Sequence, residues 1–310
     1  MNISVIICTY NRAESLRRTL ETCCDLVIPA GVQWELLVVD NNSKDHTKQV
    51  CESLAGKLPL RYLFENRQGK SYALNTAVAN TQGKLLLFTD DDVDIDPGWL
   101  AAFWNLSCRK SGCSLLGGHT RPRWEGTPPR WVQMHSPTLL RRVMMDGSRS
   151  QPLTEQAWSS FAGCNMALRK SVFATGITYR TDLGPTAETP VRSEEADLNA
   201  RLMNMGFKGY FTPQAIVYHR TNASRTTEAY VRNWFLGQGI AEVRLGEVPM
   251  VHLWFGAPRY YWRLWTLNSL LYGISRWTLS SHVWLPAEIR MAHAWGVITE
   301  CRRRTSSGSR

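Results

Sequence analysis

The fold of this 310-residue chain is indicated by a stretch that reads KLLLFTDDD from Lys84 to Asp92. Its first part is a short, uninterrupted apolar run, which is typical of a strand buried on both faces of a parallel sheet. Three consecutive aspartates follow directly. Because neighbouring carboxylates at the end of a buried strand repel one another, we expect a positively charged partner beside them.

Three earlier runs have the same apolar character and lie at Ile3–Cys8, Trp34–Asp40 and Leu60–Phe64. The segments between the runs have the apolar spacing of helices, as in Gly69–Ala79, which separates the third run from the fourth. This alternation predicts an α/β fold with an open, mostly parallel sheet, flanked by helices and joined by right-handed crossovers.

The composition is that of a globular protein with an uneven charge. Hydrophobic residues make up 44% and charged residues 20%, which argues against a disordered chain. The net charge is +10, of which residues 221–310 contribute +6 through eleven Arg, no Lys and five acidic residues. Seven of the 13 Trp lie in the same region. A basic, Trp-rich end predicts an anionic partner surface.

The eight Cys residues form no CxxC pair and no zinc-site spacing, so free thiols in a reducing compartment are expected. The N-terminus enters the first predicted strand without a basic segment, which is not the pattern of a signal peptide. Since no run of about 18 uncharged apolar residues occurs, we expect no membrane-spanning helix and a cytoplasmic protein.

Polar side chains follow each of the four predicted strands. They are Thr9, Asn11 and Arg12 after the first, Asp40 and Asn42 after the second, Glu65 and Arg67 after the third, and Asp90–Asp92 after the fourth. Ligands of open α/β sheets bind beyond the carboxyl ends of the strands, so these groups are predicted to form one site. Residues 41–43 have an alternative interpretation as ordinary turn residues.

The aspartate triplet is suited to a divalent metal ion. Alternate residues of an extended chain point the same way, so Asp90 and Asp92 can converge while Asp91 points elsewhere. Two carboxylates with phosphate oxygens are typical ligands of Mg²⁺ or Mn²⁺, whereas a solvated acidic turn is the alternative. Basic residues nearby, at Arg12, Arg67 and Lys70, make the combination suited to a diphosphate. The P-loop and GxGxxG signatures are absent, which argues against an ATPase or a Rossmann dehydrogenase.

The sequence resembles the family 2 glycosyltransferases of GT-A fold in seven motifs that occur in the family's order within residues 1–220. The motifs are SVIICTYNR at 4–12, VVDNNSKD at 38–45, NRQGKSYALN at 66–75, TDDD at 89–92, GCNMALR at 163–169, SEEADLNAR at 193–201 and YFTPQAIVYH at 210–219. The resemblance implies a metal-dependent, inverting transfer of a sugar from a nucleotide diphosphate sugar to a hydroxyl acceptor. We expect a glycan or lipid-linked acceptor from cell-surface glycan or lipid-linked saccharide biosynthesis.

Two other functions are compatible with these residues. One is a non-catalytic, membrane-associated protein that binds nucleotide sugars with the same fold. The other is a nucleotidyltransferase, which would normally carry a Gly-rich, basic first loop, unlike the residues 9–12 found here. Intact acidic motifs at 90–92 and 194–195 favour an active enzyme over the non-catalytic binding protein.

The resemblance also assigns residues to the donor site. It implies that Thr9, Asn11, Arg12 and Asp40 contact the nucleotide, Asp40 through the base. The remaining nucleotide-sugar residues are Tyr10, Asn42, Arg67, Lys70, Asn75, Asp90 and Asp91. The metal would be held by Asp92 and Asp90, with His219 as a third ligand whose alternative is a structural role. The residues beneath the acceptor and the diphosphate would be Gly163 and Asn165.

Inverting transfer requires a general base that takes the proton of the acceptor hydroxyl. In the family, the second position of the acidic motif supplies it, usually as Asp, and Glu195 stands at that position. The longer side chain leaves Glu194 as the alternative base. Acidic residues in a first helical turn are also favoured by the helix dipole alone, and Asp197 is spaced to pair with Arg201.

We expect a glycosyltransferase domain over residues 1–220, with a nucleotide-binding part at 1–95 and an acceptor and catalytic part at 96–220. The segment 121–156 has no clear period and is the expected acceptor loop. Residues 221–310 are expected to be helical and amphipathic.

A helix is predicted to start at Pro258 in this C-terminal region. Its polar stripe consists of Arg259, Arg263, Thr266, Ser269, Gly273 and Arg276. The remaining surface is apolar and Trp-rich, which is typical of a helix in a membrane interface and predicts peripheral contact with the inner face of the cell membrane. A helix packed on the catalytic domain is the alternative. No nucleic-acid partner is expected, since no binding motif accompanies the charge.

Overall fold

The structure is a computed structural model that describes residues 1–139, 149–153 and 163–307. These residues form two compact units, each of which is described by itself. Unit 1 comprises Met1–Glu125, Ser136–Thr181 and Glu194–Thr221, and unit 2 comprises Gly126–His135, Asp182–Ser193 and Asn222–Arg310, as far as they are described. The predicted acceptor loop at 121–156 lies partly outside the described residues.

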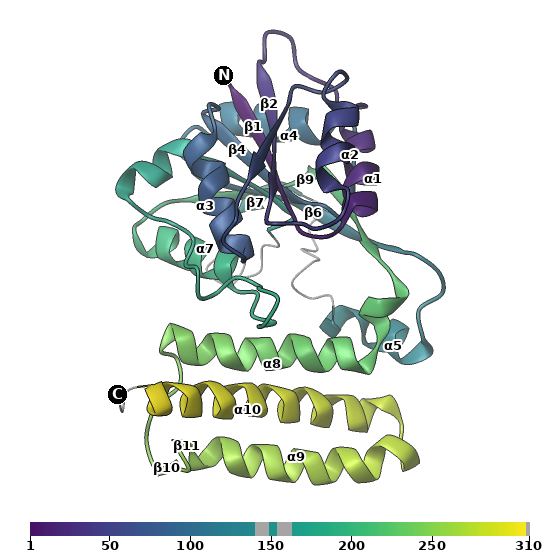
Figure 1. Cartoon of the computed structure of the whole chain (residues 1–310), viewed down its shortest axis with the longest axis vertical. Coiled ribbons are helices and arrows are strands. Elements are labelled where there is room, and N and C mark those ends of the chain that lie inside the picture. Colours follow the sequence, from purple (N-terminus) through teal and green to yellow (C-terminus); the bar gives the residue numbers. More distant parts are fainter. Residues whose placement is uncertain (140–148, 154–162, 308–310) are drawn as a thin grey trace. The chain divides into compact units, whose positions relative to one another are not determined.

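The predicted α/β fold class is confirmed in unit 1 (Figure 1). The four predicted strands are β1 (Ile3–Thr9), β2 (Trp34–Asp40), β3 (Leu60–Phe64) and β4 (Leu85–Asp90). They pair in parallel in the order β3-β2-β1-β4. Helices α1 (Ala13–Cys23), α2 (Thr47–Leu54) and α3 (Lys70–Asn80) connect them. All four strands therefore end at the same edge of the sheet.

Beyond β4 the sheet becomes mixed, which the apolar runs did not predict. It continues through β8 (Asn165–Arg169), β6 (Leu115–Trp124), β9 (Gly209–Thr221) and β5 (Val93–Ile95), with β7 (Gln151–Pro152) beside β9. Strand β8 runs antiparallel to β4 and β6, and β5 runs antiparallel to β9. The reversal at β5 pairs Val93 with His219, which brings the end of the aspartate triplet to a residue far along the chain.

Side chains of the central strands alternate between two hydrophobic clusters, as expected for a sheet covered on both faces. In β1, Ile3, Val5 and Ile7 pack into one cluster with α1, α2 and α4 (Trp99–Arg109). Ile6 points to the opposite face, where α3 and α7 (Glu194–Asn204) pack. A 3₁₀ helix, η1 (Lys170–Thr175), follows β8. The sheet is thus fixed between helices, and its polar strand ends are held rigidly.

Unit 2 is mainly helical. Its elements are α5 (Arg130–Leu139, shared with unit 1 at its end), η2 (Ala223–Thr226), α8 (Glu228–Leu245), β10 (Leu253–Trp254), β11 (Ala257–Pro258), α9 (Arg259–Thr278) and α10 (Ser281–Ser307). The helix predicted to start at Pro258 is confirmed by α9. Helix α10 packs against both α8 and α9 (Figure 1). Among the described residues, none of the helices is long and apolar enough to cross a membrane.

Two glycines allow α8 and α10 to approach closely. A Cβ atom added to Gly239 of α8 would overlap the carbonyl oxygen of His293, and one added to Gly296 of α10 would overlap that of Leu236. Ion pairs flank this contact, with Arg232 to Glu288 at 2.6 Å and Arg244 to Glu300 at 3.1 Å. The backbones of the two helices therefore meet where no side chain fits.

Substitution of Gly239 by Ala should destabilise unit 2 by about 1–3 kcal/mol, because the added methyl group forces the helices apart. The matched control is Gly273→Ala on α9, where a Cβ meets nothing within 4 Å. It should raise stability by about 0.5–1 kcal/mol, since Ala favours a helix over Gly. Urea unfolding followed by circular dichroism measures both changes, and equal midpoints for the two variants would contradict the close contact.

Candidate active site

The carboxyl ends of β1 and β4 bring the first predicted site residues together. The hydroxyl of Thr9 donates to Asp91 at 2.8 Å. The Arg12 guanidinium donates through one nitrogen to Asp91 and to Asp92, at 2.9 Å each. Burial raises the pKa of Asp91 to about 6, an effect that Arg12 opposes and that Asp92 reinforces. Arg12 is thus one of the cations that the aspartate triplet was predicted to require.

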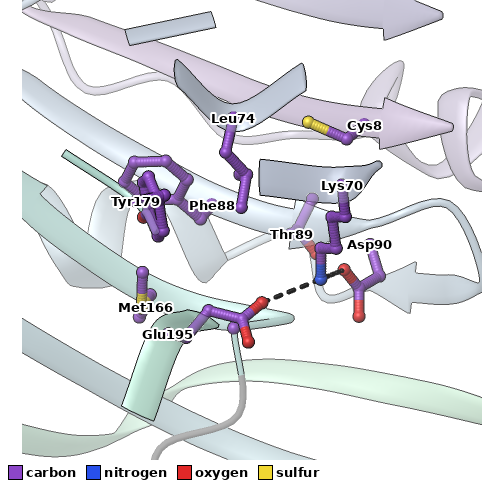
Figure 2. Close-up of a pocket in the computed structure, with 10 residues that line it drawn as sticks. Cys8, Lys70, Leu74, Phe88, Thr89, Asp90, Met166, Tyr179 and Glu195 are labelled. Carbon is purple, nitrogen blue, oxygen red and sulfur yellow. Dashed lines mark hydrogen bonds and ion pairs between the residues drawn. The ribbon is translucent and has the colours of Figure 1, made fainter. Parts of the chain in front are cut away.

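Lys70, at the start of α3, is the second of these cations. Its ammonium nitrogen lies 3.0 Å from an Asp90 oxygen and 2.8 Å from a Glu195 oxygen (Figure 2). An oxygen of Glu194 lies 3.7 Å from the same nitrogen. Burial lowers the pKa of Lys70, but the three carboxylates outweigh it and hold the pKa well above its ordinary value. Lys70 is therefore charged and connects strand β4 to helix α7.

A small pocket surrounds the Lys70 ammonium group (Figure 2). Its lining residues are Cys8, Lys70, Leu74, Phe88, Thr89, Asp90, Gly163, Met166, Tyr179 and Glu195. Gly163 is needed at its position, because an added Cβ would overlap the carboxylate of Glu195. The pocket is apolar on the Leu74, Phe88 and Met166 side and charged on the Asp90 and Glu195 side. Lys70 is the single cation among these lining residues, and the carboxylates of Asp90 and Glu195 already bond to it.

The two adjacent glutamates differ in environment although both belong to the first turn of α7. Glu194 is 1% exposed, and burial together with the neighbouring Glu195 raises its pKa well above the ordinary value. Glu195 lines the pocket and accepts from Lys70. Asp197 pairs with Arg201 at 2.6 Å, as its spacing predicted. The helix thus presents one buried carboxyl, one pocket-facing carboxylate and one structural ion pair.

Asp90, Asp92 and His219 form the predicted cluster of possible metal ligands. One ligand atom from each lies within 4.8 Å of the others. The pairing of β5 with β9 positions His219, whose Nε2 is 3.5 Å from an Asp92 oxygen. Two carboxylates and an imidazole are a donor set that Mn²⁺ accepts, and Mg²⁺ accepts the carboxylates with additional water or phosphate oxygens. These residues therefore fit a divalent ion, whose identity they leave open.

The predicted donor residues after β2 and β3 form a neighbouring hydrogen-bonded turn. Asp40 accepts from the Ser43 amide at 2.9 Å and from the Tyr62 hydroxyl at 2.8 Å. The side chain of Asn42 donates to the carbonyl of Asn66, and its φ of 68° is a left-handed conformation that Asn tolerates. Arg67 lies at the exposed side and donates to both oxygens of Glu65. Residues 41–43 therefore have the local geometry of a turn, which was the alternative interpretation of their sequence.

Tyr10 and Asn11 occupy the turn that follows β1. Tyr10 is exposed in the described part of the chain, so its side chain is accessible to a ligand. Asn11 has a left-handed φ of 51°, its amide donates to the Ser43 hydroxyl, and its side chain accepts from the Lys44 amide. The turns after β1 and β2 are thus bonded to each other and form one polar rim.

Two predicted amides are not brought into the pocket. Asn165 is buried on the opposite face of β8 from Met166, accepts from the Trp99 indole at 2.8 Å and donates to the Ala215 carbonyl at 3.0 Å. Asn75 bridges the backbone amide and carbonyl of Tyr179 at 2.9 Å each. Both side chains use their polar groups to fix the sheet and its flanking loop, so the structure gives them a supporting position and not a ligand-facing one.

Arg220 is a residue that the sequence motifs did not single out. It is buried, pairs with Asp94 and donates to the carbonyl oxygens of Val93, Ser15 and Asp91. Its backbone amide also donates to the Asp92 carbonyl at 2.9 Å. The only signal in the sequence is a charge inside an otherwise strand-like run. Arg220 therefore anchors the aspartate triplet to α1 and β9.

The comparisons with known proteins agree with this fold. The sequence model described as glycosyl transferase family 2 matches residues 4–176. Because the match covers more than half of the chain, the protein belongs to this family, and it is a glycosyltransferase of GT-A fold. This assignment supports the transferase interpretation over the nucleotidyltransferase and the non-catalytic binding protein.

Relatives and solved structures give the same class. The succinoglycan biosynthesis protein ExoM of Rhizobium meliloti (strain 1021) is 24% identical over 234 residues, which are 74% of this chain and 71% of ExoM. The glycosyltransferase AglE of Haloferax volcanii is 34% identical over 119 residues, 38% of each protein. The mannosyltransferase PcManGT from Pyrobaculum calidifontis, solved with GDP-Man and Mn²⁺, has a TM-score of 0.55 at 17% identity and covers 99% of this chain and 75% of that chain. S. aureus TarS 1-349 with UDP-GlcNAc has a TM-score of 0.56 at 14% identity, over 99% of this chain and 92% of that chain.

Removal of Arg220 should destabilise unit 1 far more than removal of a second arginine that pairs with the same carboxylate. Arg220→Ala should cost about 3–5 kcal/mol, because it leaves buried backbone carbonyls without their donor and removes the buried one of the two cations that pair with Asp94. Arg123, 61% exposed at its side chain, also bonds Asp94 at 2.6 Å. Arg123→Ala should cost at most about 1 kcal/mol, as surface pairs do. Chemical unfolding measures both, and similar losses for the two variants would show that Arg220 is not an anchor.

Proposed function

We propose that this enzyme transfers a sugar from a nucleotide diphosphate sugar to a hydroxyl acceptor, with inversion at the anomeric carbon and with Mg²⁺ or Mn²⁺ as cofactor. The observation that carries the proposal is the single network in which Arg12, Lys70, the aspartate triplet and Glu195 meet at the carboxyl ends of β1 and β4. GDP-Man and UDP-GlcNAc in the two solved neighbours support the donor class.

The proposed metal ligands are Asp92, Asp90 and His219. When bound there, the ion would neutralise the negative charge that develops on the leaving nucleoside diphosphate. Lys70 and Arg12 already lie within hydrogen-bonding distance of these aspartates. Both cations can therefore turn toward the diphosphate once the ion takes over the carboxylates. The polar rim formed by Thr9, Asn11, Asp40 and their neighbours is the proposed nucleotide contact.

The proposed general base is Glu195. A base must be ionised to take a proton, and burial together with the neighbouring Glu195 raises the pKa of Glu194, which disfavours its ionised form. Glu195 lines the pocket, where Lys70 stabilises its carboxylate. The acceptor hydroxyl would approach from this side, and the proton would pass to a Glu195 oxygen as the new glycosidic bond forms. Glu194 then serves as a neutral neighbour that fixes the first turn of α7.

The proposed setting is cell-surface glycan or lipid-linked saccharide biosynthesis at the inner face of the cell membrane. The names of ExoM, a succinoglycan biosynthesis protein, and TarS, a poly(ribitol-phosphate) β-N-acetylglucosaminyltransferase, support an acceptor of this class. Residues 1–220 would carry the reaction, with donor contacts within 1–95 and acceptor contacts within 96–220. Residues 221–310 would provide peripheral membrane contact.

A panel of nucleotide diphosphate sugars, each with Mn²⁺ or Mg²⁺, should contain at least one donor that raises the melting temperature by several degrees. Ligand at about 100 times its Kd adds about 2.7 kcal/mol to the stability of the native state. Asp92→Ala should lose the metal-dependent part of this shift, whereas Asp25→Ala, an exposed acid elsewhere in unit 1, should keep it. A full shift in Asp92→Ala would exclude Asp92 as a ligand.

Glu195→Gln should reduce sugar transfer by about 10²–10⁴-fold, the usual contribution of a general base, while calorimetry should detect unchanged donor binding. Glu194→Gln is the matched control. Because Gln resembles a neutral Glu in shape and charge, its transfer rate should stay within about tenfold of the wild type. Near-normal turnover of Glu195→Gln, with a severe loss in Glu194→Gln, would reverse the assignment of the base.

A further inference from the structure

Exposed apolar side chains are concentrated on one part of unit 2. Thirteen of the nineteen exposed large hydrophobic residues in the described chain lie between Met250 and Val283. They belong to the segment before β10, β10 itself, the turn before β11, helix α9, the connection to α10 and the first turn of α10. We call the part on α9 and the β10–β11 turn the α9 face. It comprises Leu253, Trp254, Phe255, Tyr260, Leu267, Leu270, Leu271, Ile274 and Trp277.

Helix α9 buries two polar residues while several of its large apolar residues are exposed. Ser275 is 0% exposed and Asn268 is also buried, whereas Ile274 is 66% exposed and Trp277 is 84% exposed. A helix that faces water places its apolar residues inward and its polar residues outward. The predicted polar stripe is interrupted, because Arg276 turns to Glu228 at the start of α8. The outward side of α9 is thus suited to an apolar environment.

The turn between β10 and β11 extends this face and is fixed to α9. The Trp262 indole donates to the Trp254 carbonyl at 2.7 Å, and the Phe255 and Trp262 rings meet at 6.0 Å between centroids. Phe255 itself is 83% exposed. Since α9 packs against α10 on its other side, the turn and the outward side of α9 remain uncovered in the described part of unit 2 (Figure 1).

The charges around the α9 face are of one sign. Between Met250 and Val283 the sequence contains three Arg and neither Asp nor Glu. Arg259 and Arg263 are exposed on α9. Arg302 of α10 lies beside the turn, because a Cβ on Gly256 would meet its Cγ at 3.5 Å. An apolar stripe with Trp, Tyr and flanking Arg is the pattern of a helix that lies in the plane of an anionic lipid interface.

We propose that the α9 face inserts into the surface of a membrane that contains anionic lipid, with Phe255 and Trp277 among the acyl chains and Arg259, Arg263 and Arg302 at the phosphates. A second copy of this chain would bring the same arginines and no acidic group to pair with them, so lipid phosphate is the better complement. The inference rests on the part of the proposed function that gives residues 221–310 a peripheral membrane contact, and it names the surface and the lipid chemistry of that contact.

Co-sedimentation with vesicles tests the docking surface. The wild type should bind vesicles of phosphatidylcholine with about one third phosphatidylglycerol, and bind pure phosphatidylcholine much less. The double variant Leu270→Glu/Ile274→Glu should lose about tenfold or more in partitioning, because it places charge in the apolar stripe. Arg259→Gln and Arg263→Gln should each weaken binding to the anionic vesicles by about fivefold. The matched control is Val27→Glu, the same kind of change at an exposed apolar residue of unit 1, and it should bind as the wild type does.

Equal vesicle binding by the wild type and the double variant would overturn the proposal. So would sedimentation velocity in which the wild type self-associates, the double variant is monomeric, and neither binds vesicles, because the face would then be a contact between copies. The donor-induced thermal shift separates this outcome from the proposed function. Asp92→Ala should bind vesicles normally, and the double variant should keep the full donor shift if only the membrane contact is affected.

Discussion

The structure of unit 1 depends on how it neutralises the carboxylates that lie together at one edge of the sheet. The acids are Asp90, Asp91, Asp92, Glu194 and Glu195, and each would repel the others in a buried setting. Arg12 and Lys70 lie within hydrogen-bonding distance of four of them, and burial raises the pKa of the fifth, Glu194. Each cation is shared between acids, so the balance of charge depends on how the fold brings together residues from separate segments of the chain.

This balance explains why the site is suited to an anionic donor. The proposed diphosphate and divalent ion carry opposite charges, so binding both would change the net charge of the site little. Lys70 is central, since it joins Asp90, twenty residues away in the chain, to Glu195, 125 residues away. Buried Arg220 stabilises the same region, because it donates to the backbone carbonyls of Val93 and Asp91. The site is rigid in its backbone and adaptable in its charged side chains.

Unit 2 is held together by the packing of its helices. Its helices bury small and polar residues, with Gly239 and Gly296 at the contact of α8 with α10 and Ser275 within the packed side of α9. Large apolar residues such as Ile274 and Trp277 remain outside. The composition of this region indicated an anionic partner, and Arg259, Arg263 and Thr266 of the predicted polar stripe are exposed. The helix packs through Trp262 and Trp265, which lie beside Trp295.

By itself, the sequence determined the four parallel strands and the polar residues that follow them, because apolar period and strand ends are local properties. Ordered motifs within residues 1–220 also determined the family. The motifs also implied His219 beside Asp92, and the pairing of β5 with β9 brings the two together. Tertiary structure alone decided that Arg220 anchors the triplet and that Asn75 and Asn165 serve the framework. It also separated Glu194 from Glu195 and chose the outer side of α9. The physical reason is that strand register, burial and helix packing bring together residues far apart in the chain, and no local pattern records which of them meet.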